Sequence, residues 1–159
     1  MGKIGEKIKL SSKKSYATSL QSVRTGEAGL NEHRTNMLNR VPESGNWTNF
    51  KKDSLTTKDI AFLSAYTGHE FAILRGKHTD ILFHGMERHC TFDDDLVELL
   101  KSGKLELVAH SHPDAERIVP SKDDRDFLKK IGQKESCIVS YITGKENTFT
   151  ANMFDDLFS

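Results

Sequence analysis

The 159-residue sequence has only two cysteines and no long apolar run. Cys90 and Cys137 lie far apart without CxxC spacing, so we expect reduced thiols in a cytosolic protein rather than a disulfide framework. No apolar segment approaches the ~20 residues of a membrane span. The lysine-containing N-terminus also lacks the apolar core of a secretory signal. Composition therefore predicts a cytoplasmic protein that does not enter membranes.

The chain has no excess of either charge, but the two signs are unevenly distributed. Residues 1–52 carry ten Lys or Arg and four acids, a net charge of +6, whereas residues 53–159 carry thirteen and nineteen, a net charge of −6. Aromatic side chains are sparse in residues 1–52, which argues against a base-stacking surface. We therefore expect residues 1–52 to form a basic, poorly ordered N-terminal arm, either solvated or in contact with nucleic acid or an acidic partner.

Only weak structural patterns occur within this expected arm. A loose helical pattern from Gln21 to Asn39 is interrupted by Gly26 and Gly29. Trp47 and Phe50 are large apolar residues near its end, and we expect them to pin the arm onto the domain that follows.

Residues 53–159 show regular helix and strand patterns and are expected to form one domain. A helix that starts at Ser54 or Thr56 should end at Gly68. Further strands are expected at 70–75, 79–84, 104–109, 136–143 and 148–153, and further helices at 93–101 and from Ser121 onward. Strands interleaved with helices predict an α/β or α+β sandwich with a mixed sheet.

The pattern His110-Ser111-His112-Pro113 follows the predicted strand 104–109, and Asp124 lies in the first turn of the next predicted helix. Residues two apart in a strand point the same way, so the two imidazoles should converge if the strand continues. A carboxylate from the helix would be a third ligand. Two His, one Asp and a water form an open tetrahedral zinc site of the catalytic type.

A simpler interpretation applies to the same residues. An HxH pair alone is weak evidence for a metal. Ser121 and Asp124 also have the spacing of a capping box, in which each side chain accepts a hydrogen bond from the other residue's backbone N–H. The two interpretations are compatible, because a cap can also hold a ligand in place.

His-x-His-Pro followed by Ser-x-x-Asp resembles the signature of the JAMM (JAB1/MPN/Mov34) metalloproteases, which include bacterial and phage JAB-domain proteins and have RadC-like relatives. The resemblance extends from about Thr67 to Met153. Seven residues separate Pro113 from Ser121, one more than in the family pattern. The helix cap favours Asp124 as the ligand, whereas a fixed distance from the histidines would favour Asp123.

The resemblance implies a three-layer, cytidine-deaminase-like JAB/MPN sandwich with a mixed sheet. It also implies that Glu70, at the start of a strand, is the general base and acid. Glu87 is the alternative, because it is the only acid between the expected strand 79–84 and the expected helix 93–101. Ser121 would stabilise the oxyanion, and His110, His112 and Asp124 would bind Zn²⁺.

The expected function is therefore a zinc-dependent peptidase or isopeptidase that hydrolyses an amide bond of a peptide or protein substrate with a metal-activated water. The alternative is a catalytically silent JAB-like binding or scaffold module in a phage, toxin or DNA-associated assembly. A cysteine nucleophile is disfavoured, because neither Cys90 nor Cys137 has a histidine at a suggestive spacing.

Overall fold

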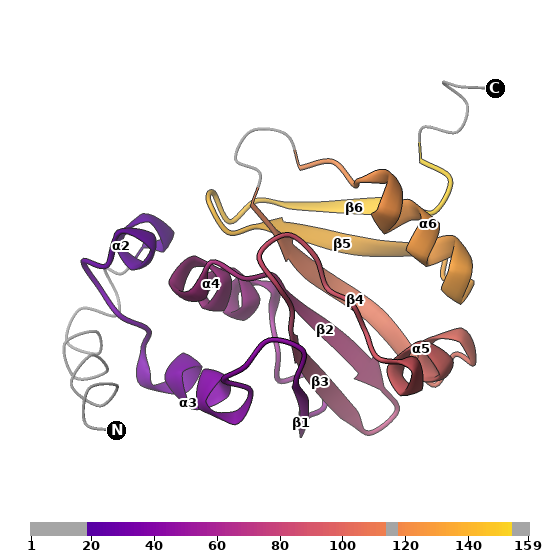
Figure 1. Ribbon diagram of the computed structural model, residues 1–159, viewed down its shortest axis with the longest axis horizontal. Helices are drawn as coiled ribbons and strands as arrows, with labels where there is room; N and C mark the ends of the chain where they lie inside the picture. Colours follow the sequence, from indigo (N-terminus) through magenta and orange to yellow (C-terminus); the bar gives the residue numbers. More distant parts are fainter. Residues whose placement is uncertain (1–18, 114–117, 154–159) are drawn as a thin grey trace.

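The computed structural model describes residues 19–113 and 118–153. Within them lie five helices and six strands (Figure 1). The helices are α2 (Leu20–Thr25), α3 (Glu32–Arg40), α4 (Thr57–Thr67), α5 (Asp94–Lys101) and α6 (Lys122–Ile131). The strands are β1 (Trp47–Lys51), β2 (Phe71–Gly76), β3 (Thr79–His84), β4 (Leu105–His112), β5 (Glu135–Ser140) and β6 (Glu146–Thr150).

The strands form one mixed sheet in the order β1-β3-β2-β4-β5-β6. β2 and β3, which match the strands expected at 70–75 and 79–84, form a hairpin, and all neighbouring pairs are antiparallel except β4 and β5. Parallel neighbours require a crossover connection. Here the crossover contains α6, which lies directly between β4 and β5 in the chain.

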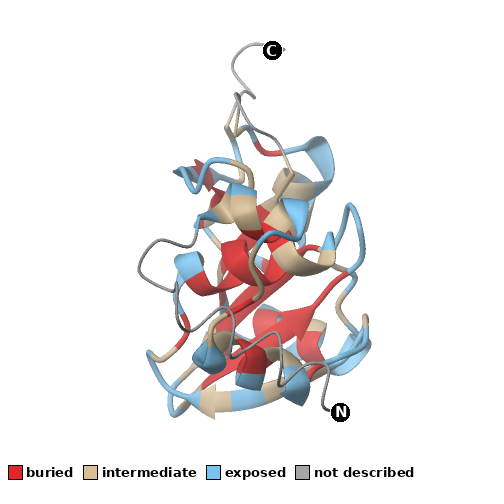
Figure 2. Cartoon of the chain, turned by 90° about the vertical axis from the view of Figure 1, so that its left-hand side faces the viewer, coloured by how far each residue is buried: buried red, intermediate tan, exposed pale blue. Residues whose placement is uncertain are grey.

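Helices cover both faces of this sheet, so the fold has three layers (Figure 1). On one face, α4 packs on the strands beside α2 and α3, over a core that includes Val23, Val41, Leu63, Phe71 and Leu82. On the other face, α5 and α6 cover a second core that includes Leu74, Phe83, Leu96, Leu107, Leu128 and Phe149. Figure 2 shows the buried residues gathered between these layers. The expectation of an α/β fold with a mixed sheet is confirmed.

Local sequence signals set the helix ends as expected. The Thr56 side chain caps α4, rather than that of Ser54, and Gly68 ends this helix in the left-handed conformation. Asp93 caps α5, and Ser121 caps α6 in a capping box with Asp124. These caps place the first turn of each helix independently of the distant packing.

One strand ends earlier than expected. The pattern predicts a strand through Thr143, but β5 ends at Ser140. The Ser140 hydroxyl accepts hydrogen bonds from the backbone N–H groups of Ile142 and Thr143, each at 3.0 Å. This side chain starts the turn, and the following strand begins at Glu146 instead of residue 148.

β4 contains one extra residue, Val108. In the ladder with β2, neighbouring β2 residues pair with Ala109 and Leu107, so Val108 is left over as a bulge. Val108 and Ala109 both pack against the core beneath α4. The alternation then restarts, so that Leu107, His110 and His112 all lie on the α5/α6 side.

The structure differs from the expected division at residue 52. β1 pairs with β3 along its whole length, and Val23 and Val41 are fully buried in the core beneath α4. The loose helical pattern in this segment is two short helices, α2 and α3. Residues 19–52 therefore belong to the same folded unit as the rest of the described chain.

Residues 1–18, which contain the lysine-rich start of the expected arm, lie outside the described residues. Contact of this segment with nucleic acid or an acidic partner stays a prediction. Among the described residues, no helix is both long enough and apolar enough to cross a membrane.

Asp80 on β3 is a fully buried acid with several hydrogen bonds. Its carboxylate accepts from the Arg75 guanidinium at 2.7 and 2.9 Å and from the backbone N–H of Leu55 at 3.1 Å. Burial raises the pKa of the Asp80 carboxyl, but these donors more than compensate and hold it below its ordinary value. The interaction ties the β2–β3 hairpin to the segment that leads into α4.

We expect Asp80→Asn to lower the free energy of unfolding at pH 7 by about 3 kcal/mol, because it leaves Arg75 without its buried partner. Asp53→Asn is the matched control. Asp53 lies 3.2 Å from the same guanidinium but its side chain is 70% exposed, so its loss should cost less than about 1 kcal/mol. Urea titrations of the three proteins measure both values.

The same contribution should depend on pH. Because folding lowers the pKa of Asp80, its stabilisation is complete above the unfolded value near ~4 and is lost as the pH falls through the folded value. The stability difference between wild type and Asp80→Asn should therefore shrink in acid. A difference that grows in acid would contradict this assignment.

Candidate metal centre

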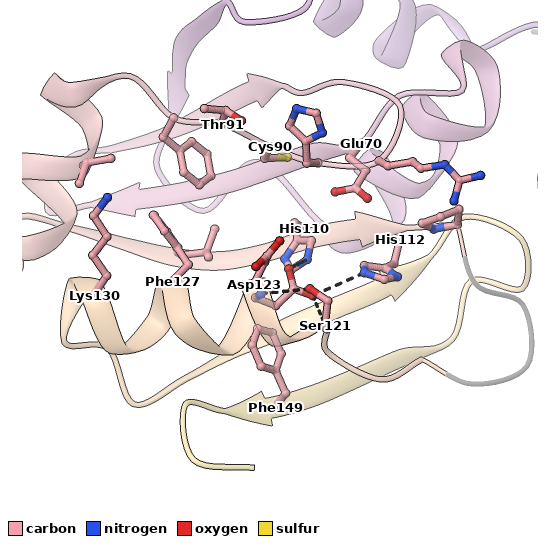
Figure 3. Close-up of a pocket in the computed structure, with 17 residues that line it drawn as sticks. Glu70, Cys90, Thr91, His110, His112, Ser121, Asp123, Phe127, Lys130 and Phe149 are labelled. Atoms are coloured by element: carbon pink, nitrogen blue, oxygen red, sulfur yellow. Dashed lines mark hydrogen bonds and ion pairs between the residues drawn. The ribbon is translucent and has the colours of Figure 1, made fainter. Parts of the chain in front are cut away.

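Three potential metal ligands converge where β4 ends and α6 begins (Figure 3). His110 Nε2 lies 3.2 Å from Asp124 Oδ1, and His112 Nε2 lies 3.5 Å from Asp124 Oδ2. One ligand atom from each of the three residues lies within 4.8 Å of the others. Two imidazoles and a carboxylate leave a fourth position for solvent or substrate, which is the donor set of an open zinc site.

The capping box of α6 fixes the direction of the carboxylate. Asp124 Oδ2 accepts from the backbone N–H of Ser121 at 2.9 Å, and Ser121 Oγ accepts from the backbone N–H of Asp124 at 3.0 Å. The other oxygen, Oδ1, faces His110. The Asp124 carboxylate is therefore both part of the helix cap and a candidate metal ligand, and the two interpretations of the sequence are compatible here.

The electrostatics of the group suit a cation. Burial raises the pKa of the Asp124 carboxyl, but the close approach of the His110 and His112 imidazoles lowers it well below its ordinary value. His110 Nε2 is buried and has no hydrogen bond of good geometry to the described residues. An unsatisfied buried nitrogen costs free energy, and a metal ion shared with the carboxylate would satisfy it. The residues present thus fit Zn²⁺.

Ser111, between the two histidines, faces the opposite layer. Its hydroxyl oxygen accepts from the backbone N–H of Phe71 at 2.8 Å and shares a hydrogen bond with the Ser64 hydroxyl of α4. The side chain thereby takes a place in the β2–β4 ladder that a backbone carbonyl would otherwise fill. It holds the histidine-bearing end of β4 against both β2 and α4.

Glu70 lies on the other wall of the site, immediately before β2, and is 3% exposed. Ala72 pairs with His110 in the antiparallel β2–β4 ladder, so Glu70, two residues before Ala72, lies at the end of β2 that is beside the histidine-bearing end of β4. In Figure 3 the Glu70 carboxylate points toward the two histidines.

The segment after β3 holds the backbone of Glu70 in place. Glu70 N–H donates to the Met86 carbonyl and Gly85 N–H donates to the Glu70 carbonyl, both at 2.7 Å. A Cβ at Gly85 would lie 2.7 Å from the Glu70 carbonyl and from Cys90 Sγ, and 2.9 Å from the His89 carbonyl. Only glycine permits this close approach.

Neither thiol has the character of a nucleophile. Burial, together with the charges of Glu70 and Asp124, raises the pKa of the Cys90 thiol well above its ordinary value. Burial and Glu146 raise the pKa of Cys137 to about 11. Both thiols therefore stay protonated at neutral pH, in agreement with the expectation from their spacing.

A cavity of about 640 Å³ contains the candidate metal centre. Its volume lies within the range of about 300–1,000 Å³ that small-molecule sites occupy. Seventeen residues line it: Glu70, Arg88, His89, Cys90, Thr91, Phe92, Val97, Leu107, His110, His112, Pro113, Ser121, Asp123, Asp124, Phe127, Lys130 and Phe149.

The predicted site residues gather in this cavity, with one choice resolved. Asp124, rather than its neighbour Asp123, meets the histidines; Asp123 lines the cavity but is exposed. Ser121 is at the rim. Glu87, the alternative to Glu70, is exposed and is not among the residues that line the cavity.

Several residues of the site were not singled out from the sequence. Gly85 and Ser111 act through the backbone contacts described above, which depend on distant partners. Phe127 had a local signal, because it follows Asp124 by one helical turn and therefore lies on nearly the same face of α6.

Of the remaining histidines, His89 lines the cavity and His33 and His78 are exposed, whereas His69 and His84 have structural contacts. His84 is buried, its Nδ1 donates to the Val41 carbonyl at 2.7 Å, and its Nε2 lies 2.8 Å from His69 Nδ1. Burial lowers the pKa of His84, which favours this neutral, hydrogen-bonded state. These contacts join the end of α3 to β3.

No protein-family model, curated protein or solved structure matches the chain. The interpretation of the site therefore depends on the contacts of its own residues.

We expect Gly85→Ala to lower the free energy of unfolding by about 1–3 kcal/mol, because the new methyl group overlaps the backbone of Glu70 and His89. Gly76→Ala is the control in the same hairpin. A Cβ there would meet the Leu105 side chain at 3.2 Å and the Lys104 carbonyl at 3.3 Å, and should cost less. Urea unfolding measures both losses, and equal values would contradict the close packing at Gly85.

Proposed function

We propose that this chain is a zinc-dependent peptidase or isopeptidase. The observation that carries the proposal is the convergence of His110, His112 and Asp124 in one cavity with the buried carboxylate of Glu70. An open site with two imidazoles and one carboxylate beside a separate acid is the arrangement that zinc hydrolysis of an amide requires.

His110, His112 and Asp124 would hold the ion. When bound, Zn²⁺ supplies a Lewis acid that polarises a carbonyl and lowers the pKa of water. The low pKa of the Asp124 carboxyl keeps that group ionised at neutral pH. The capping box of α6 and the bulge in β4 hold the three donor side chains close together even when no ion is bound.

Glu70 is the proposed general base and acid. Its carboxylate would accept a proton from the attacking water and donate it to the leaving amine. Its position in the same cavity as the two histidines supports this role, as does burial, which shields the carboxylate from bulk solvent. The hydrogen bonds that hold its backbone to Gly85 and Met86 limit its movement.

Ser121 is the proposed oxyanion donor. Its hydroxyl oxygen already accepts the Asp124 N–H, so its own proton remains to be donated toward the cavity. A developing negative charge on the substrate oxygen would be stabilised by that O–H.

The resemblance to the JAMM signature rests on these same residues and agrees with the proposal. The JAB/MPN type of three-layer sandwich is part of the same proposal. The family also suggests the competing function, a silent scaffold module that keeps the residues without the chemistry. Metal binding separates the two.

We expect purified protein incubated with zinc and then dialysed to retain about one Zn²⁺ per chain. His112→Ala and Asp124→Ala should each lose it, because each removes a ligand. Asp123→Ala is the matched control, one residue away on the same helical turn, and should retain the ion. Inductively coupled plasma mass spectrometry measures the content.

Circular dichroism should show that each of these variants stays folded. Wild-type protein without zinc after loading would overturn the enzyme proposal and favour the scaffold function. Loss of zinc in Asp123→Ala but not in Asp124→Ala would show that the wrong carboxylate has been assigned.

Glu70→Gln separates binding from catalysis. We expect it to retain zinc but to hydrolyse a peptide library at least about 100-fold more slowly than wild type, because the amide cannot accept the proton. Glu87→Gln, in the nearby exposed segment, is the control and should keep wild-type activity. Mass spectrometry of the cleaved peptides gives the rates, and undiminished cleavage by Glu70→Gln would remove Glu70 from the mechanism.

A further inference from the structure

The cavity extends well beyond the candidate metal centre. Figure 3 shows Glu70 and His112 toward one end, and Phe127 and Lys130 toward the other, with His110 between them. Only part of the volume of about 640 Å³ is therefore next to the ligands.

Besides the candidate ligands and other polar residues, the cavity is lined by apolar side chains from several elements. These are Phe92 before α5, Val97 on α5, Leu107 on β4, Phe127 on α6 and Phe149 on β6. We refer to these five residues as the apolar wall. They belong to the α5/α6 core or pack against the cavity beside it.

The elements that supply the metal ligands also supply this wall. On β4, the bulge makes Leu107 the neighbour of His110 on the cavity side of the strand. On α6, Phe127 follows Asp124 by three residues, a rise of about 4.5 Å along the helix axis. The apolar wall therefore begins directly beside the site where a scissile bond would lie.

Aromatic contacts give the wall a defined shape. The Phe92 ring packs against Phe83 and Phe127, with centroids 4.7 and 5.5 Å apart. Phe149 meets the ring of His110 edge-on at 6.2 Å. Phe92, Val97 and Phe127 are nevertheless only half-buried, so each leaves apolar surface facing the cavity.

We propose that the apolar wall is a specificity subsite that binds a large apolar side chain, of the Leu, Met or Phe class, next to the scissile amide. This inference rests on the proposed zinc peptidase function. A large apolar side chain would remove the half-buried aromatic and aliphatic surface from water, which favours its binding. Small or charged side chains would leave that surface in contact with water and so bind less tightly. The substrates are then peptides with a bulky apolar residue at this position.

The test uses two zinc-binding probes and the zinc-loaded full chain. Acetohydroxamate has only a methyl group beside its chelating head, whereas 3-phenylpropionohydroxamate carries a phenyl ring that can reach the wall. Calorimetry should give a dissociation constant roughly 100-fold lower for the phenyl compound, since each methylene in an apolar pocket contributes about 10-fold or more.

Val97→Phe fills the subsite and should bring the ratio of the two dissociation constants close to one. Leu99→Phe is the matched control on the same helix, because Leu99 is 36% exposed and lies outside the cavity lining; it should keep the wild-type ratio. Phe127→Ala is a second test that shortens the wall instead of filling it, and should also lower the ratio.

The outcomes distinguish the two proposals. If zinc is held and both hydroxamates bind equally well to wild type, the subsite is refuted and the metal centre stands. An unchanged ratio in both folded variants, Val97→Phe and Phe127→Ala, would likewise refute it. If wild type holds no zinc, the proposed function fails and the subsite fails with it.

Discussion

The candidate centre depends on a single strand, β4, serving two layers. Leu105 and Leu107 complete the core beneath α5 and α6, while Ala109 packs beneath α4. If side chains alternated strictly along β4, the burial of both leucines beneath α5 and α6 would point both histidines toward α4 instead. Buried imidazoles among apolar side chains would then lack partners. The bulge at Val108 interrupts this alternation by one residue, so that His110 and the leucines lie on the same face of the strand.

The second constraint is electrostatic and lies in α6. The Asp124 carboxylate completes the helix cap with one oxygen and faces His110 with the other. A change at Asp124 would therefore affect both the stability of the first turn of α6 and the geometry of the site. Asp123 beside it is exposed and has neither role. A helix start of this kind positions a charged group more firmly than a loop would.

The sequence predicted what is set by local chemistry. The strands β2 and β3, the end of α4 at Gly68, the helix near 93–101 and the α/β class follow from patterns a few residues long. Alternation also put the two imidazoles on one face of the strand, and the helix cap set the direction of Asp124, but the bulge that turns the histidines toward α6 depends on the pairing with β2. The resemblance pointed to Glu70, and the register of β2 against β4 gives that position a geometric basis.

What the sequence did not reveal arises from distant contacts. The segment before residue 52 is polar on average, and the burial of Val23 and Val41 appears only when α4 and the sheet lie beside them. Gly85 is required by the backbone of residues on two other segments. The apolar wall is assembled from four separate parts of the chain, which come together only in the folded molecule.

The parallel pairing of β4 with β5 affects how the molecule reaches its native state. The two strands cannot pair until the intervening α6 crossover has closed, so this part of the sheet involves a costly loop closure. A cation held between β4 and α6 would act as a reversible cross-link within that crossover. By mass action it would shift the folding equilibrium toward the native chain as the free ion concentration rises. The persistence of the fold would then follow the metal supply of its surroundings.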